Sequence, residues 1–291
     1  MDFLQQTLSG IALGCIYALI ALGFVLIYKA TETVNFAQGE LMMLGAFLGL
    51  ILMKFVGLPF WAAVVVTLVG MTGFGILLER MAIRPILGQP QFTVVMLTIG
   101  MGYVMRGLIT MVPVIGSETS ALDIPYKGGL WNAGGLVLSV EQIVVIVVTG
   151  VLCAGLYLLF KYSKVGIAMQ ASSQNQLAAH YMGIPVKRLN GLVWGLSAAV
   201  AALAGLMLAP FTFVHVNMGF IGLKAFPAAV VGGFGSLPGA VVGGLIIGVV
   251  EAWAGFYLPE GFKDVAPYVV VLVMLIIKPN GLFGGQMRKK V

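Results

Sequence analysis

Long apolar stretches separated by short polar segments run through the whole of this 291-residue chain. Most stretches approach the roughly 20 residues that a helix needs to cross about 30 Å of hydrocarbon. The pattern predicts an all-α polytopic membrane protein: a bundle of about eight or nine transmembrane helices that forms a single transmembrane domain over 1–291. The expected spans are 7–28, 36–53, 59–79, 91–112, 139–160, 190–212, 221–237, 239–257 and 265–279.

Composition excludes an ordinary soluble domain. The mean hydropathy of the chain is +1.06. Only 9% of its residues are charged, whereas soluble domains have about 25%. The formal charge of +6 comes from basic residues in loops and at the C-terminus. This distribution indicates membrane topology and gives no reason to expect a nucleic acid partner.

Short loops rich in lysine and arginine mark the cytoplasmic side of a membrane protein. Basic residues occur at 79–85, at 161–189 and at 288–290. With an external N-terminus and nine crossings, all three segments lie on one side of the membrane. The loop 116–135, with one lysine and two acidic residues, then lies on the other side. We therefore expect a cytoplasmic C-terminus and an extracytoplasmic loop at 116–135.

Sequence signatures of catalysis and of metal binding are missing. There is no P-loop motif, and His180 and His215 are far apart with no ligand spacing around them. No Ser-His-Asp pattern is present. We expect that this chain is not an enzyme and that it binds neither a cofactor nor a metal ion. Cys15 and Cys153 lie in apolar stretches, where a thiol acts as a small hydrophobe.

The ionisable residues inside the apolar stretches are Glu40, Arg106, Glu141 and Glu251. A charged residue at membrane depth suggests a functional site. The alternative is a structural role, in which the residue pairs with a partner on another helix or at the membrane interface. We favour partners for Arg106 and Glu141, which lie near expected helix ends, and both interpretations stay open for Glu251. A carrier driven by protons or sodium would show a denser relay of acids or histidines.

Two segments are poorly suited to form plain spans. In 31–46, a polar cluster (Asn35, Gln38 and Glu40) stands at the start of an otherwise apolar helix. In 224–244, glycines and prolines interrupt helical continuity, above all in the Gly-Pro segment 227–239. Interrupted segments in both halves of a transporter are the best sequence pointer to its pathway. A cytoplasmic cap and a tight interhelical turn are the alternatives, and 221–237 also fits a re-entrant segment.

If both segments line the pathway, the polar cluster and the Gly-Pro segment should approach each other in the folded bundle. The expected orientation puts the polar cluster near the cytoplasmic mouth, as a gate more than as a midplane binding site. The candidate pathway residues are Asn35, Gln38, Gly39, Glu40, Pro227, Gly232, Gly233, Gly235 and Glu251.

The segment 161–189 has no membrane-length apolar run, and its residues 167–182 predict a short amphipathic helix. Gly183 suits the position after the helix end, and Pro185 then breaks the helix. The polar face lacks the lysines and arginines of a membrane-surface helix, so docking into a groove of another protein fits better. The expected apolar face comprises Ile167, Ala171, Leu177, Ala178, Tyr181 and Met182.

The run LAAHYMGIPV (177–186) resembles the core of the coupling loop in bacterial ABC importer permeases, which docks into the ATPase subunit. The common form begins with glutamate, where this chain has Leu177. Three motifs extend the resemblance: VNFAQGELMMLGA (34–46), GIAMQASSQNQLAAHYMGI (166–184) and FPAAVVGGFGSLPGAVVGG (226–244). Together they are similar to the branched-chain amino acid ABC transporter permease family (Liv-type), and to its H-type subunit in particular.

The resemblance implies a permease subunit in the bacterial inner (plasma) membrane. Its partners would be a homologous second permease, two P-loop ATPase subunits that bind ATP and Mg, and a periplasmic solute-binding protein. The cytoplasmic coupling loop would be about 161–189. The coupling residues in this interpretation are Ala171, Asn175, Leu177, Ala178, Ala179, Met182, Gly183 and Ile184.

The solute stays open at this point. Members of the resembled family transport branched-chain amino acids, but also urea, short amides and aromatic acids. The alternative to a branched-chain amino acid permease is therefore an ABC permease for one of these solutes or for sugars. A less favoured alternative is a secondary transporter or a channel that works without an ATPase. It predicts a dense charge relay and no docking helix, which is the opposite of what the sequence contains.

Overall fold

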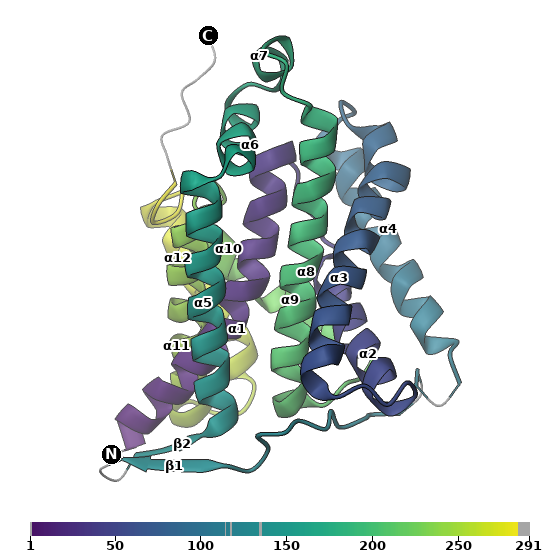
Figure 1. Cartoon of the computed structure of the whole chain (residues 1–291). Coiled ribbons are helices and arrows are strands. Elements are labelled where there is room, and N and C mark those ends of the chain that lie inside the picture. Colours follow the sequence, from purple (N-terminus) through teal and green to yellow (C-terminus); the bar gives the residue numbers. More distant parts are fainter. Residues whose placement is uncertain (1, 114, 117, 134–135, 285–291) are drawn as a thin grey trace.

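The computed structural model describes residues 2–113, 115–116, 118–133 and 136–284, and it is almost entirely helical (Figure 1). A short antiparallel hairpin, β1 (Leu130–Ala133) and β2 (Leu136–Ser139), precedes α5. The helices are α1 (Asp2–Thr31), α2 (Gln38–Lys54), α3 (Phe60–Leu78), the π-helical turn η1 (Glu79–Ile83), the 3-10 turn η2 (Arg84–Ile86), α4 (Gln91–Thr110), α5 (Val140–Tyr162), α6 (Lys164–Gln174), α7 (Gln176–Tyr181), α8 (Val186–Thr212), α9 (Met218–Lys224), α10 (Phe226–Gly232), α11 (Leu237–Tyr257) and α12 (Phe262–Ile277).

Among the described residues, six helices are long and apolar enough to cross a membrane: α1, α3 with its extension to Ile86, α4, α5, α8 and α11. α2 and α12 are apolar too but have 17 and 16 residues. In place of the expected span 221–237, two seven-residue helices, α9 and α10, form one interrupted pass. The expectation of an all-α polytopic membrane protein with broken segments is confirmed.

α1 and α8 form the centre of the bundle. α1 packs against α11, α8 and α5, and α8 packs against α1, α2 and α3. A helix that other helices surround has no need of a polar face, which explains why α1 is apolar on all sides. Its buried side chains include Tyr17 and Phe24, and the largest buried side chain of α8 is Trp194.

Glycines bring α1 and α11 together. A Cβ at Gly248 would overlap the backbone of Gly14, and a Cβ at Gly244 would overlap Ala18. Lipid provides no hydrophobic force between helices, so close backbone packing has to hold them. The contact between these two helices is the most extensive in the bundle.

One end of the bundle, which we call the α7 end, carries α6, α7 and the turns η1 and η2 (Figure 1). There Gln176 Nε2 donates to the carbonyl of Ala30 at 2.9 Å, and Arg84 Nη2 donates to the carbonyl of Lys187 at 3.1 Å. The opposite, or hairpin, end carries β1, β2 and the start of α1. The basic segments 79–85 and 161–189 lie at one end and the described part of 116–135 lies at the other, as the charge pattern requires. The third basic segment, 288–290, lies outside the described residues.

Gly248→Leu is expected to lower the stability of the bundle, because its side chain has to displace the α1 backbone at Gly14. Overpacking of this kind costs about 1–3 kcal/mol. Thermal unfolding of the detergent-purified protein, monitored by size-exclusion chromatography, measures the effect. The control is Gly150→Leu on α5, where a Cβ meets no atom within 4 Å. Equal unfolding temperatures for the two variants would contradict the α1–α11 contact.

Candidate functional site

α2 begins inside the bundle and not at its surface. After Thr31 the chain turns back along α1, so that the side chain of Gln38 lies against Gly23. Gly23 precedes the end of α1 by eight residues, or about 12 Å of helix rise. The expectation that the polar cluster lies at the mouth of the bundle is therefore wrong. The segment 32–37 carries the chain inward before the helix starts.

Polar side chains satisfy the interrupted backbone at this point. The hydroxyl of Thr98 accepts a hydrogen bond from the backbone N–H of Phe36 at 3.2 Å. Asn35 Nδ2 donates to Gln38 Oε1 at 3.3 Å, and Gln38 Nε2 donates to the carbonyl of Ser197 at 3.4 Å. The Ser197 hydroxyl lies 3.1 Å from Gln38 Oε1. Asn35 and Gln38 are fully buried. These hydrogen bonds join the start of α2 to α4 through Thr98 and to α8 through Ser197.

Glu40 and Arg106 form an ion pair between α2 and α4. The guanidinium carbon of Arg106 also lies 3.8 Å from the ring centre of Phe220 in α9, a cation–π contact. The carboxylate of Glu40 lies against Gly219, where a Cβ would overlap it. Arg106 has an interhelical partner, as expected, and the pair connects three helices.

α9 packs on the first turn of α2 with no room for side chains. A Cβ at Gly39 would overlap the carbonyl of Gly219, and a Cβ at Gly222 would overlap the backbone of Gly39. At the start of α10, the ring of Phe226 lies 5.5 Å from that of Phe36. The polar cluster thus lies beside α9 and the break after it. α9 packs directly on the start of α2, and Phe226, which directly precedes the Gly-Pro segment, reaches Phe36. A pathway lined by both segments stays a prediction.

The Gly-Pro segment forms a tight turn near the α7 end. Pro227 lies in the first turn of α10, whose cap Gly233 has a left-handed φ of 95°. Such a φ favours glycine because glycine has no Cβ. The backbones of Gly232 and Gly239 approach too closely for a Cβ on either residue. Gly235 instead faces open space and lines a cavity.

Glu251 is buried and has partners on other helices. It accepts a hydrogen bond from the hydroxyl of Tyr17 at 2.6 Å, and Lys224 Nζ lies 3.8 Å from its other oxygen. Lys224 at the end of α9 also pairs with Asp264 of α12. The interhelical interpretation therefore fits Glu251. Glu141 likewise accepts from the backbone N–H of Gly128, in the loop before β1, at 2.8 Å.

The helix expected over 167–182 is broken in two. Asn175 ends α6 and caps α7, with extended dihedrals of −158° and 102°. Its side-chain oxygen accepts from the N–H of Ala178 at 3.0 Å, which is an N-cap bond. The break turns α7 away from α6, so the expected apolar stripe from Ile167 to Met182 is not continuous. α7 is the most protruding helix of its end (Figure 1).

α7 ends as expected at Gly183, whose φ is 83°. The N–H of Ile184 bonds the carbonyl of Ala179 at 3.0 Å, and the N–H of Gly183 bonds that of His180 at 3.0 Å. This pair of bonds is a Schellman motif. Gly183 is required here for its conformation, since a Cβ would meet no atom within 4 Å.

The candidate coupling residues differ in accessibility. Leu177 and Met182 are exposed by 69% and 83%, and Ala178 and Gly183 are exposed as well. Ala179 is buried, while Ala171 and Ile184 are half-buried. The side of α7 that faces away from the bundle therefore carries Leu177, Ala178 and Met182.

Comparison with known proteins identifies the family. A family model described as "Branched-chain amino acid transport system / permease component" matches residues 6–278. This chain belongs to that family of permeases. The three motifs singled out in the sequence all lie within the matched range.

Curated relatives cover nearly the whole permease. It is 33% identical to the high-affinity branched-chain amino acid transport system permease protein LivH of Escherichia coli (strain K12), over 99% of this chain and 98% of LivH. It is 32% identical to BraD of Pseudomonas aeruginosa, with the same coverage. A more distant relative is the fructose import permease protein FruF of Bifidobacterium longum, 29% identical over 81% of this chain and 66% of FruF.

A solved structure shares the fold. PsaBC from Streptococcus pneumoniae in complex with Fab matches the permease with a TM-score of 0.51 and 15% identity, over 97% of this chain and 94% of that chain.

Sequence reasoning missed two polar groups of the permease. Ser197 holds Gln38 and donates to the carbonyl of Gly23 at 2.9 Å, but a single serine in an apolar helix gives no signal. Glu79 is fully buried and pairs with Arg84 at 2.6 Å. An acid and an arginine five residues apart at the edge of a span were the available clue.

Removing one partner of the Glu40–Arg106 pair is expected to destabilise the permease more than removing both. Arg106→Met leaves a partly buried carboxylate unpaired, at a cost of about 3–5 kcal/mol. Glu40→Gln/Arg106→Met removes both charges, and Glu40→Gln alone tests the other side. Thermal unfolding in detergent should rank the double variant above Arg106→Met. The reverse order would show that the pair is not a structural link between α2 and α4.

Proposed function

We propose that this chain forms, together with a second homologous permease, the membrane pathway of an ABC importer for branched-chain amino acids. The observation that carries the proposal is the polar start of α2 inside the bundle, beside the interrupted pass of α9 and α10. Non-helical backbone at membrane depth survives only where protein buries it or where it lines a cavity. The candidate residues of the polar cluster and the Gly-Pro segment are assigned to this pathway.

The Glu40–Arg106 pair suits a zwitterionic solute. Glu40 Oε2 and Arg106 Nε are buried and hydrogen-bond to no described residue. A carboxylate accepts from an ammonium group, and a guanidinium binds a carboxylate. A shift of α4 against α2 would offer both groups to an amino acid, and Phe220 would offer it an apolar surface.

ATP binding and hydrolysis belong, in this proposal, to two separate P-loop ATPase subunits that dock on α7. Two hydrogen bonds can transmit a movement of α7 to the bundle. Gln176 connects it to the end of α1 through the carbonyl of Ala30. Arg84 connects the turn after α3 to the start of α8 at Lys187, four residues after the end of the α7 motif at Gly183.

The α7 end is cytoplasmic in this proposal, and the permease lies in the bacterial inner membrane. We assign the C-terminus to the cytoplasm as well, from the basic residues at 288–290. The hairpin end faces a periplasmic solute-binding protein, which delivers the solute. The basic loops at 79–85 and 161–189 support this orientation.

A permease for another small polar solute is the alternative. The relationship to a fructose import permease keeps sugars among the candidates, and urea, short amides and aromatic acids fit a pathway of the same kind. Uptake of labelled leucine, fructose and urea in cells with and without the transporter distinguishes them. The proposal requires that leucine uptake depends on this chain.

Ala178→Arg is expected to abolish leucine uptake and to reduce co-purification of the ATPases at least tenfold. Ala178 lies exposed on α7, so a long charged side chain would obstruct close docking while leaving the bundle intact. Ala179 is unsuitable as a test position because it is buried. Gly183 is unsuitable because its φ of 83° would strain any other residue placed there.

The control for docking is Ala121→Arg, an exposed alanine in the loop between α4 and the hairpin. It adds the same charge at the other end of the molecule and should leave ATPase binding unchanged. Normal ATPase binding by the Ala178→Arg permease would remove α7 from the docking surface.

The orientation is tested with single cysteines at Gln174 and Thr119 in a chain without Cys15 and Cys153. Both positions are exposed, and they lie at opposite ends. An impermeant thiol reagent applied to spheroplasts should label Thr119→Cys and spare Gln174→Cys until the membrane is opened. Labelling with the opposite pattern would invert the proposed topology.

A further inference from the structure

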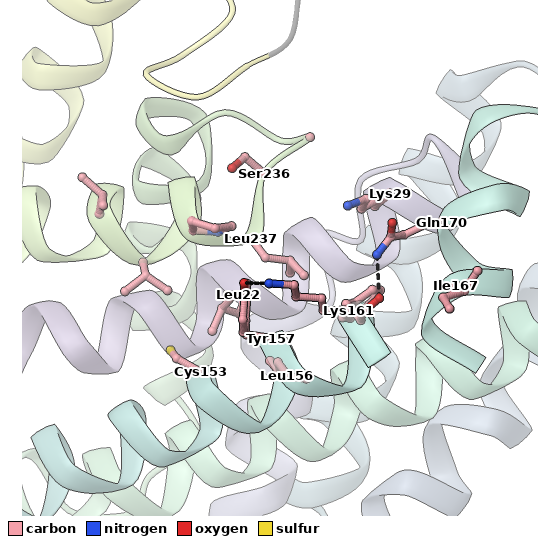
Figure 2. Close-up of a pocket in the computed structure, with 15 residues that line it drawn as sticks. Leu22, Lys29, Cys153, Leu156, Tyr157, Lys161, Ile167, Gln170, Ser236 and Leu237 are labelled. Carbon is pink, nitrogen blue, oxygen red and sulfur yellow. Dashed lines mark hydrogen bonds between the residues drawn. The ribbon is translucent and has the colours of Figure 1, made fainter. Parts of the chain in front are cut away.

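A cavity of about 670 Å³ lies near the α7 end, between α1, α5, α6 and the start of α11 (Figure 2). Both α5 and α11 pack on α1, and the cavity is the space left between them. It is open to the outside of the bundle, because Tyr157 and Ile167 at its rim are exposed by 53% and 54%. The apolar residues of its wall include Leu22, Cys153, Leu156, Phe160, Leu237 and Val241.

Two lysines line this cavity. Lys29 is in the last turn of α1 and Lys161 is in the last turn of α5. Lys161 Nζ donates to the hydroxyl of Tyr157 at 2.8 Å. Figure 2 shows Lys29 beside Gln170, Lys161 nearer the middle of the cavity with its amino group directed at the hydroxyl of Tyr157, and Cys153 toward the opposite end. The cations thus lie near the helix ends, and the apolar wall continues deeper along the bundle.

The charge of these lysines is not balanced within the cavity. No aspartate or glutamate of the described residues lines it. Among the described residues, no carboxylate forms an ion pair within 4.0 Å with Lys29 or Lys161. Lys29 instead lies 5.8 Å from the ring centre of Phe160. A ligand with a negative group at this level and an apolar part below it would complement both features.

We propose that this cavity binds an anionic phospholipid. The phosphate lies between Lys29 and Lys161, and an acyl chain extends along Leu156 and Val241. Basic pockets between transmembrane helices, near the membrane boundary, are suited to such headgroups. The lipid would join α5 to α11 and contact α6, directly before α7. Its assignment to the inner leaflet rests on the proposed orientation, but the binding site itself does not.

The test is native mass spectrometry of the full chain, purified in neutral detergent alone and with whichever subunits co-purify. Phosphatidylglycerol and phosphatidylcholine of equal chain length are the two probes. The unaltered permease should bind phosphatidylglycerol preferentially. Lys29→Gln/Lys161→Gln should reduce that preference about tenfold. Lys54→Gln/Lys127→Gln is the matched control: both lysines are exposed at the hairpin end, so the preference should be unchanged.

A second variant tests the apolar part and does not depend on charge. Val241→Trp fills the cavity and should reduce binding of both lipids while leaving the two lysines in place. Unchanged phosphatidylglycerol preference in Lys29→Gln/Lys161→Gln would overturn the proposal. Binding to the chain alone but not to the assembled complex would do so too, since another subunit would then cover the cavity. Lipid binding is measured without transport, so its failure is distinct from failure of the proposed function.

Discussion

Backbone polar groups inside a membrane need hydrogen-bond partners from the protein itself, and this constraint governs the arrangement around α2. The chain reaches α2 as a non-helical segment within the bundle, where side chains accept hydrogen bonds from the N–H groups of Phe36 and Ala37. Asn35 Oδ1 accepts from the N–H of Ala37 at 3.1 Å, and Thr98 accepts from Phe36. α4 must therefore remain beside this segment. Ser197, through Gln38, holds α8 in the same way. The inward start of α2 is possible because α4 and α8 complete its hydrogen bonds.

Glycine serves two different purposes in the bundle. Between α1 and α11 it allows two long helices to lie in backbone contact, which makes a rigid pair. Between α2 and α9 it allows a helix start to touch a seven-residue helix, with Gly39 against Gly219 and Gly222. In the second contact, α2 is the main helix partner of α9. The long pair is suited to serve as a frame, and the short contact lies where the polar residues of the candidate pathway gather.

The apolar stretches predicted the helices well, because each crossing needs a length and a composition that the sequence displays directly. The polar helix was also found, and its end at Gly183 followed from the conformation that glycine allows. The depth of the polar cluster was not predictable in the same way. Nothing between Thr31 and Gln38 states that the chain turns inward, since that path depends on Thr98 and Ser197, which are distant in sequence. The break at Asn175 was missed because asparagine was taken as a helical residue when it serves as a cap.

α9 has only seven residues, far fewer than the roughly 12–15 at which an isolated helix becomes even marginally stable. Its helical state therefore depends on its neighbours. Gly219 and Gly222 rest on α2, Phe220 lies against Arg106, and Lys224 joins α11 and α12 through Glu251 and Asp264. Any rearrangement that separates α2 from α11 removes supports from both sides of α9 at once. The folding of this one segment is thus coupled to the separation of the two halves of the chain, and its backbone amides would exchange hydrogen in step with that opening.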